Sequence, residues 1–102
     1  AKRISCSLYD YFEIVCMRNS KVVVSLKNKQ QFSGIAKTLI HENGTEFLSL
    51  MQSDQTLVNI NLTDVTILSA CNNAIEHHNF SVSLYSRYFH AIFLVSITPL
   101  TY

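Results

Sequence analysis

The residues from Lys21 to Ile40 constrain the fold more than any other part of the chain. Two apolar runs in this stretch alternate with a period of two, which is typical of strands, and a polar link separates them. The sequence therefore predicts a β-hairpin with strands at about 21–26 and 31–40. Gly34 falls inside the second strand, where glycine commonly marks a sharp bend, so we expect this strand to curl and the sheet to close into a small barrel.

Further elements are predicted on both sides of this hairpin. The segment Ser7-Leu8-Tyr9-Asp10 resembles a capping box and precedes a helical pattern, which predicts a helix from about Leu8 to Arg18. The pair Asn43-Gly44 is typical of a tight hairpin turn. Three more strands are expected at about 47–50, 56–61 and 65–68, and one helical turn is expected at 61–64. The predicted fold class is mainly β (α+β), with an N-terminal helix followed by a five-stranded, strongly bent small barrel.

The character of the sequence changes after Ser69. Residues 70–79 are polar and lack a clear period, and we interpret them as a linker or a short helix. Residues 80–102 are strongly apolar, but the apolar run is too short for a transmembrane helix and is interrupted by Arg87 and His90. The chain is therefore divided into a domain at 1–69 and a C-terminal extension of unknown role at 70–102.

The apolar cluster of this extension, from Leu84 to Leu94, needs a cover, because an exposed apolar patch of that size would favour aggregation. A packed helix, an added strand or an interface segment would each provide one. We expect the barrel or a second copy of the chain to cover the cluster. The protein is then a monomer or a weak homodimer through its tail.

Composition restricts the partner and the compartment. Lysine and arginine number 8 against 7 aspartate and glutamate residues, so the overall charge does not indicate a nucleic-acid partner. The three cysteines form neither a disulfide framework nor a CxxC pair, and the first residues lack the unbroken apolar stretch of a secretory signal. We expect a cytoplasmic protein.

No pattern in the sequence indicates catalysis, a cofactor or a metal. There is no glycine-rich phosphate loop and no Ser/His/Asp order, so we do not expect an enzyme. Cys71, His77, His78 and His90 can be combined on paper into a metal site. Neighbouring histidines point apart, however, and the spacing matches no common zinc motif, so we expect surface histidines instead.

Residues 4–69 carry a resemblance to a known family. The most specific part is the spacing Ile4-x-Cys6-x-x-Tyr9-Asp10-x-x-Glu13-x-x-Cys16, and it is accompanied by Leu26-Lys27, Ala36, Glu46, Leu48, Leu62 and Ser69. In these positions the chain is similar to the Rho-binding antiterminator family, Rof, of bacteria. The hairpin also resembles the first motif of Sm-like, SH3-type small barrels. The second Sm motif is absent, so the function of RNA-binding Sm rings is not carried over.

The resemblance to Rof implies a binding protein. Members of that family bind the transcription terminator Rho at its primary RNA-binding site and keep RNA off it. The resemblance therefore implies Rho as the partner, with no direct binding of RNA by this chain. On this reading Asp10 and Glu13 pair with lysine or arginine of Rho, Tyr9 supplies an aromatic anchor, and Met17 shares their face of the helix.

Two alternatives remain open. Acids near the start of a helix are favoured by the helix dipole alone, and Tyr9 would be half-buried if it packs against the barrel. The chain would instead be an Sm-like RNA-binding module if four lysines form a basic stripe, although a solvated rim of the barrel also explains them. These lysines are Lys21, Lys27, Lys29 and Lys37. Cys6 and Cys16 are expected to pack the helix.

Overall fold

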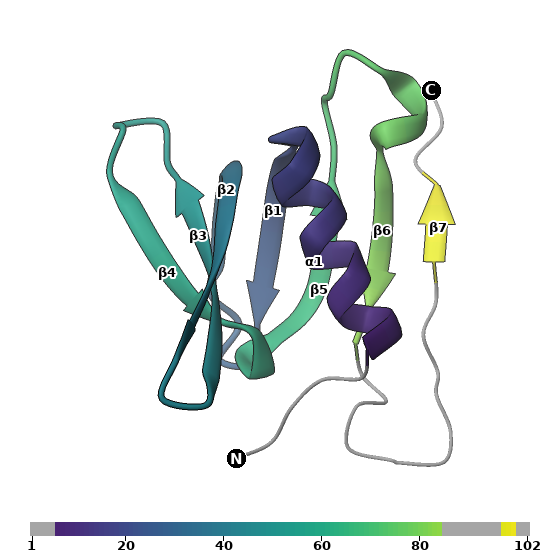
Figure 1. Cartoon of the computed structure of the whole chain (residues 1–102). Coiled ribbons are helices and arrows are strands. Elements are labelled where there is room, and N and C mark those ends of the chain that lie inside the picture. The colour runs from purple at the N-terminus through teal and green to yellow at the C-terminus, as the bar shows by residue number, and fades with distance from the viewer. Residues whose placement is uncertain (1–5, 85–96, 100–102) are drawn as a thin grey trace.

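The computed structural model describes residues 6–84 and 97–99, and in this part of the chain one α-helix accompanies a seven-stranded sheet (Figure 1). The helix, α1, comprises Cys6–Arg18. Two short 3₁₀ helices are η1 (Leu62–Asp64) and η2 (Glu76–His78). The strands are β1 (Lys21–Leu26), β2 (Gln31–Glu42), β3 (Thr45–Met51), β4 (Leu57–Asn61), β5 (Val65–Ala70), β6 (Phe80–Ser83) and β7 (Ile97–Pro99).

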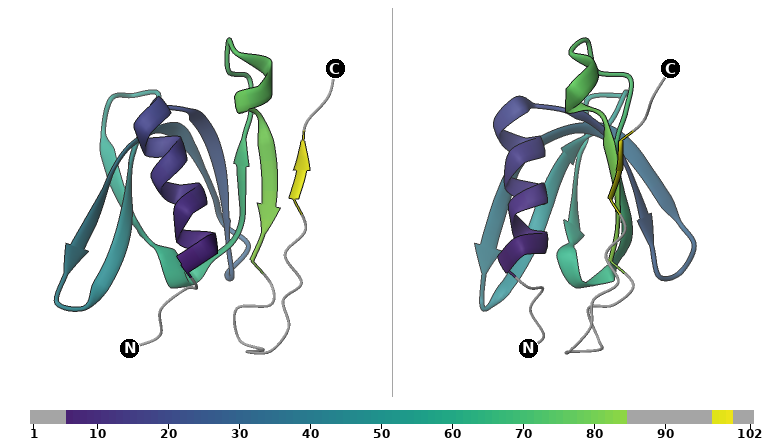
Figure 2. Two further views of the ribbon diagram at one scale, coloured as in Figure 1. Left: turned by 45° about the vertical axis from the view of Figure 1, so that its right-hand side comes forward. Right: turned by 90° about the vertical axis from the view of Figure 1, so that its right-hand side faces the viewer.

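The sheet is antiparallel, with the strand order β4-β3-β2-β1-β5-β6-β7. The first four strands form a meander, and the chain then returns through η1 so that β5 pairs with the free side of β1. The curled sheet has α1 on one side (Figure 2). The predicted fold class, mainly β with an N-terminal helix, is confirmed. The count of five strands is wrong, because β6 and β7 continue the sheet beyond β5, and the described strands form an open sheet in place of the predicted barrel.

The predicted hairpin is confirmed as β1 and β2. Val22 and Val24 are buried on one side of β1, as the alternation predicts, and Val22 lies opposite Gly34 in the register. The tight turn between β2 and β3 is also confirmed. Asn43 and Gly44 have φ angles of 52° and 77°, the positive values that a type I′ turn requires.

Gly34 has a different role from the predicted one. A Cβ atom at this position would overlap the carbonyl oxygen of Met51 and lie 2.8 Å from its carbonyl carbon, so glycine permits the close approach of β2 to the end of β3. The register shift between β2 and β3 falls later, between Ala36 and Thr38. A bulge bends its strand and increases the local twist, so we assign the bend of β2 to this shift.

Helix α1 begins two residues before the predicted start and ends in a Schellman motif. Asn19 has a left-handed φ of 48°, and its N–H donates to the carbonyl of Cys16 at 3.1 Å. The N–H of Ser20 donates to the carbonyl of Val15 at 2.9 Å. The side-chain amide of Asn19 also donates to the carbonyl of Ala36 at 3.1 Å, which fixes the end of the helix to β2.

The hydrophobic core lies between α1 and the sheet. Leu8, Phe12 and Val15 recur at helical spacing on one face of α1, and each is at most 4% exposed. They share one cluster of buried side chains with the sheet. The sheet and η1 contribute Val22, Val24, Ala36, Leu48, Leu50, Ile60, Leu62, Val65, Leu68, Ala70 and Val82.

The segment between β5 and β6 is a loop that contains η2, and Asn73 fixes it to the start of β1. The side-chain oxygen of Asn73 accepts from the N–H of Lys21 at 2.8 Å, and its amide nitrogen donates to the carbonyl of Lys21 at 3.3 Å. The same nitrogen donates to the side-chain oxygen of the buried Asn79 at 2.9 Å. These hydrogen bonds position η2 relative to β1.

The first part of the predicted extension belongs to the sheet. Phe80–Ser83 is an added strand, β6, which pairs with β5. Leu84 is buried in the core, and its N–H donates to the carbonyl of Thr66 at 2.8 Å. The rest of the predicted apolar cluster, from Tyr85 to Leu94, lies outside the described residues. No helix in the described part of the chain is long and apolar enough to cross a membrane.

Candidate protein-binding surface on helix α1

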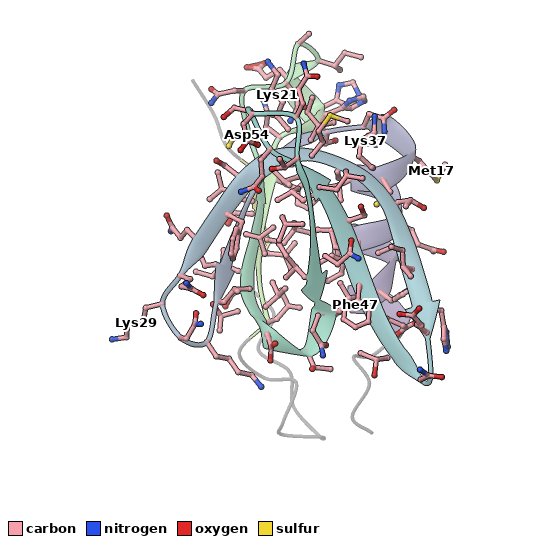
Figure 3. All side chains as sticks on the ribbon, turned by 90° about the vertical axis from the view of Figure 1, so that its left-hand side faces the viewer. Met17, Lys21, Lys29, Lys37, Phe47 and Asp54 are labelled. Atoms are coloured by element: carbon pink, nitrogen blue, oxygen red, sulfur yellow. The ribbon has the colours of Figure 1, made fainter. Side chains whose placement is uncertain are left out.

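Asp10, Glu13 and Met17 lie along the solvent-facing side of α1. Their spacing of three and four residues places them on the same face of a helix, and all three are exposed. Met17 is 82% exposed and projects away from the sheet (Figure 3). No described residue forms an ion pair with either carboxylate. The anchored helix therefore presents two acids, neither paired with a described residue, and a thioether, and we call these three residues the acidic face.

The helix dipole does not explain the two acids. Helix α1 begins at Cys6, and no acid lies in its first turn. The dipole effect falls off within that turn, so at Asp10 and Glu13 it gives little stabilisation. Charged side chains are usual on the solvent-facing side of a helix, and there they are also accessible to a partner.

Tyr9 lies at the border of the acidic face. Its side chain is half-buried and packs against the hydrophobic core, as one of the two alternatives for this residue predicts. A partner would therefore meet only part of the ring. Tyr9 continues the acidic face toward the sheet without projecting from it.

Cys16 lies on the same border of the acidic face as Tyr9, two helical turns further along α1. Burial, followed by the nearby Glu13 carboxylate, raises the pKa of its thiol from 9.0 to about 11. A thiol with this pKa is almost entirely protonated at neutral pH and is a poor nucleophile. The prediction that Cys16 packs the helix is confirmed, whereas the side chain of Cys6 lies outside the described part of the structure.

The four lysines of the RNA-binding alternative are not gathered into a stripe. Lys21 and Lys27 lie at opposite ends of β1, which separates them by roughly 20 Å at the rise of an extended strand. Lys29 is in the turn after β1, and Lys37 is at the register shift of β2. Figure 3 shows Lys29 far from both Lys21 and Lys37. The structure divides the predicted stripe between two ends of the molecule.

A basic cluster lies at the C-terminal end of α1, and no pattern in the sequence predicts it. Arg18 ends the helix and is exposed, and η2 contributes His77 and His78, whose rings lie 4.9 Å apart edge to face. Partial burial, the Arg18 guanidinium and the His77 ring together hold the pKa of His78 below its ordinary value. We call these three residues the basic cluster.

The metal site considered for Cys71, His77, His78 and His90 is only partly within the described residues. Among the described residues, no group of three His, Cys, Asp or Glu side chains is arranged to hold a metal ion. Cys71 is half-buried just after β5, and His90 lies outside the described residues. The described structure thus assigns no metal chemistry to the histidines of η2.

The fold and the exposed side of α1 define a small α+β protein with one helix anchored on a curled antiparallel sheet. The sequence profile of a family described as modulator of Rho-dependent transcription termination (ROF) matches residues 3–81. Because this match covers most of the chain, the chain belongs to the ROF family. The resemblance found in the sequence is thereby confirmed, and the role of the family is regulatory.

The fold is similar to that of a solved structure, YaeO bound to magnesium from Vibrio cholerae O395, with a TM-score of 0.63. The match has 16% sequence identity and covers 74% of this chain and 96% of the other. At this identity the likeness shows the fold alone. A comparison with curated proteins finds no match.

Proposed function

We propose that this chain inhibits Rho-dependent transcription termination by binding Rho with the acidic face and Tyr9. The primary RNA-binding site of Rho is the contact, and the bound chain keeps RNA off it. Membership of the ROF family supports modulation of termination. The observation that supports this site is the pair of exposed carboxylates of Asp10 and Glu13, which lie one helical turn apart and form no ion pair with the residues that the structure describes.

The electrostatics of RNA binding support this assignment. A site that holds RNA is lined with lysine and arginine, because neutralisation of phosphates supplies much of the affinity. Carboxylates on a rigid helix compete for the same cations. Hydrogen bonds to charged groups contribute about 1.5–3 kcal/mol each, so two such contacts decide whether the complex forms.

The helix suits such a contact because it is ordered before binding. Phe12 and Val15 are fully buried beneath the acidic face, and the Schellman motif fixes the end of the helix. A preorganised surface loses little conformational entropy on association. The proposed action needs only occupancy of the RNA site in the cytoplasm and involves no catalytic step.

Charge reversal of the acidic face tests the proposal. The variant Asp10→Lys/Glu13→Lys is expected to bind purified Rho at least about 100-fold more weakly than the wild type, as the loss of about 3 kcal/mol requires. It should also fail to displace a labelled RNA from Rho or to reduce termination in a transcription assay. The control Glu42→Lys/Asp64→Lys changes the net charge equally at exposed positions outside α1 and should behave like the wild type.

Two results contradict the proposal in different ways. Unchanged Rho binding by Asp10→Lys/Glu13→Lys would mean that α1 is not the contact, whatever the partner. Tight, salt-dependent binding of RNA by the isolated protein, without any binding to Rho, would instead support the lysine-based RNA-binding module.

A further inference from the structure

We propose that the partner-binding surface of α1 is bipolar: it runs from the acidic face onto the basic cluster of Arg18, His77 and His78. The partner is a protein surface with basic groups opposite Asp10 and Glu13 and acidic groups opposite the basic cluster. This inference rests on the proposed function of α1. It adds the chemistry of the partner surface and the orientation in which the helix docks.

The basic cluster lies beside the C-terminal end of the acidic face. Arg18 ends α1 directly after the exposed Met17, and its side chain leaves the helix about 100° around the axis from that of Met17, toward one flank of the acidic face. The C-terminal end of α1 and the loop with η2 lie at the same end of the molecule (Figure 2). The Arg18 guanidinium lowers the pKa of His78, which is the effect of a positive charge close to that ring.

Hydrogen bonds on both sides of this end hold the charges in place. The side chain of Asn19 joins the helix end to β2, and Asn73 joins the η2 loop to Lys21 at the start of β1. Only Ser20 separates Asn19 from Lys21 in the chain. The two fixed points are therefore close together, and the arrangement of the basic cluster is part of the fold.

The charges of the basic cluster are not compensated within the described part of the chain. No described carboxylate forms an ion pair with Arg18 or with the histidines. After its own burial, the groups that act on the pKa of His78 are two bases, Arg18 at the end of α1 and His77 in η2, and the carboxylate closest to them in the sequence is that of Glu76 at the start of η2. Carboxylates of a partner would relieve this repulsion.

The surface favours a protein partner over a nucleic acid. A phosphate strand that follows the basic cluster onto α1 would meet the carboxylates of Glu13 and Asp10, so the acidic face repels it. Two of the large apolar side chains that are exposed, Met17 at 82% and Ile75 at 49%, belong to the helix end and to the η2 loop. Methionine and arginine are enriched in protein interfaces. The net charge of +1 also differs from that of an all-acidic mimic of RNA.

A bipolar surface fixes the direction of docking, since a reversed helix would place like charges opposite each other. It also makes binding depend on pH. An acidic partner surface favours protonated histidine, so affinity should rise as pH falls toward the pKa of His78, which lies below its ordinary value of 6.5 in the free protein. The free protein holds the pKa of His78 low, and binding to carboxylates would raise it, with uptake of protons.

The test uses the full chain and purified Rho. The variant Arg18→Glu/His77→Glu is expected to bind Rho at least tenfold more weakly, and the control Lys29→Glu/His41→Glu, with the same formal charge change at exposed positions elsewhere, should not. In the wild type, affinity should be several-fold higher at pH 6 than at pH 8, and His77→Gln/His78→Gln should remove this difference. Circular dichroism and thermal unfolding check that each variant is folded.

The outcomes separate this inference from the proposed function. If Asp10→Lys/Glu13→Lys weakens binding but Arg18→Glu/His77→Glu matches its control, the surface is not bipolar and the acidic face still binds Rho. If neither variant weakens binding, the proposed function is wrong and the inference with it. If the isolated wild type binds a labelled single-stranded RNA and Arg18→Glu/His77→Glu loses that binding, the basic cluster serves RNA and the proposed protein contact is overturned.

Discussion

The two faces of α1 have the same periodicity, but different constraints determine their residues. Phe12 and Val15 are fully buried on one face, and packing against the sheet determines their size and shape. Asp10, Glu13 and Met17 on the other face contact no charged partner among the described residues, and the fold does not require them. The comparison suggests that stability resides in the first face and recognition in the second, and substitutions on each side can break this division.

The largest expected effect is the loss of a buried ring. Phe12→Ala should lower the free energy of unfolding by about 3–5 kcal/mol, because it removes a fully buried side chain and leaves a cavity. Met17→Ala, on the exposed face, should stay within about 0.5 kcal/mol of the wild type while weakening Rho binding. Urea unfolding followed by circular dichroism measures both. A cost below about 1 kcal/mol for Phe12→Ala would show that this face does not anchor the helix.

The part of the fold that the sequence predicts is the part set by local patterns. The apolar spacing of α1, the alternation of Val22 and Val24 and the turn at Asn43-Gly44 all depend on neighbouring residues, and all are found in the structure. The pairing of β6 with β5 depends on a distant segment and follows a polar loop, so no local period indicates it. The role of Gly34 likewise depends on the backbone of another strand.

The residues of the candidate site also divide into those that a local pattern predicts and those that only the folded chain brings together. Exposure of Asp10, Glu13 and Met17 follows from the helical period alone, and it was predicted. The basic cluster needs η2 to fold back toward Arg18, which the hydrogen bonds of Asn73 bring about. The lysines of the RNA-binding alternative are spread over the fold for a related reason, because the length of β1 separates lysines that are close in sequence.

Cys16 provides a test of the comparison between the buried and exposed faces of α1, because it lies where the two faces meet. Its pKa of about 11 lowers the thiolate fraction near neutral pH about 100-fold relative to a thiol at 9.0. In a chain with Cys6→Ser and Cys71→Ser, an aromatic disulfide reagent at pH 8 should label Cys16 about 100-fold more slowly than in urea. Glu13→Gln should speed the labelling, since the Glu13 carboxylate is the second cause of the shift.

The same shift predicts how stability depends on pH. The folded state keeps the Cys16 thiol protonated, whereas the unfolded chain loses this proton near pH 9. The contribution of this thiol to stability is therefore present below about pH 9 and is lost as pH rises toward 11. Labelling of the folded chain as fast as that of the unfolded chain would place Cys16 on the exposed face.

The smallest expected effect concerns Tyr11, which joins the buried side of α1 to the added strand β6. Its ring lies 5.6 Å from that of Phe80 at an interplanar angle of 46°. Aromatic pairs of this kind contribute about 0.5–1.5 kcal/mol beyond the area that they bury, so a double-mutant cycle with Tyr11→Leu and Phe80→Leu should give a coupling energy of that size.

A matched cycle between Met17→Leu and Phe80→Leu provides the control, since Met17 is 82% exposed on the opposite face and should give a coupling energy near zero. If Tyr11 and Phe80 were also uncoupled, β6 would not support the helix. The acidic face would then depend on β1 to β5 alone, and truncation after Ser69 would preserve it. A measurable coupling instead means that β6, which lies beyond the predicted domain boundary, helps to hold the acidic face in place.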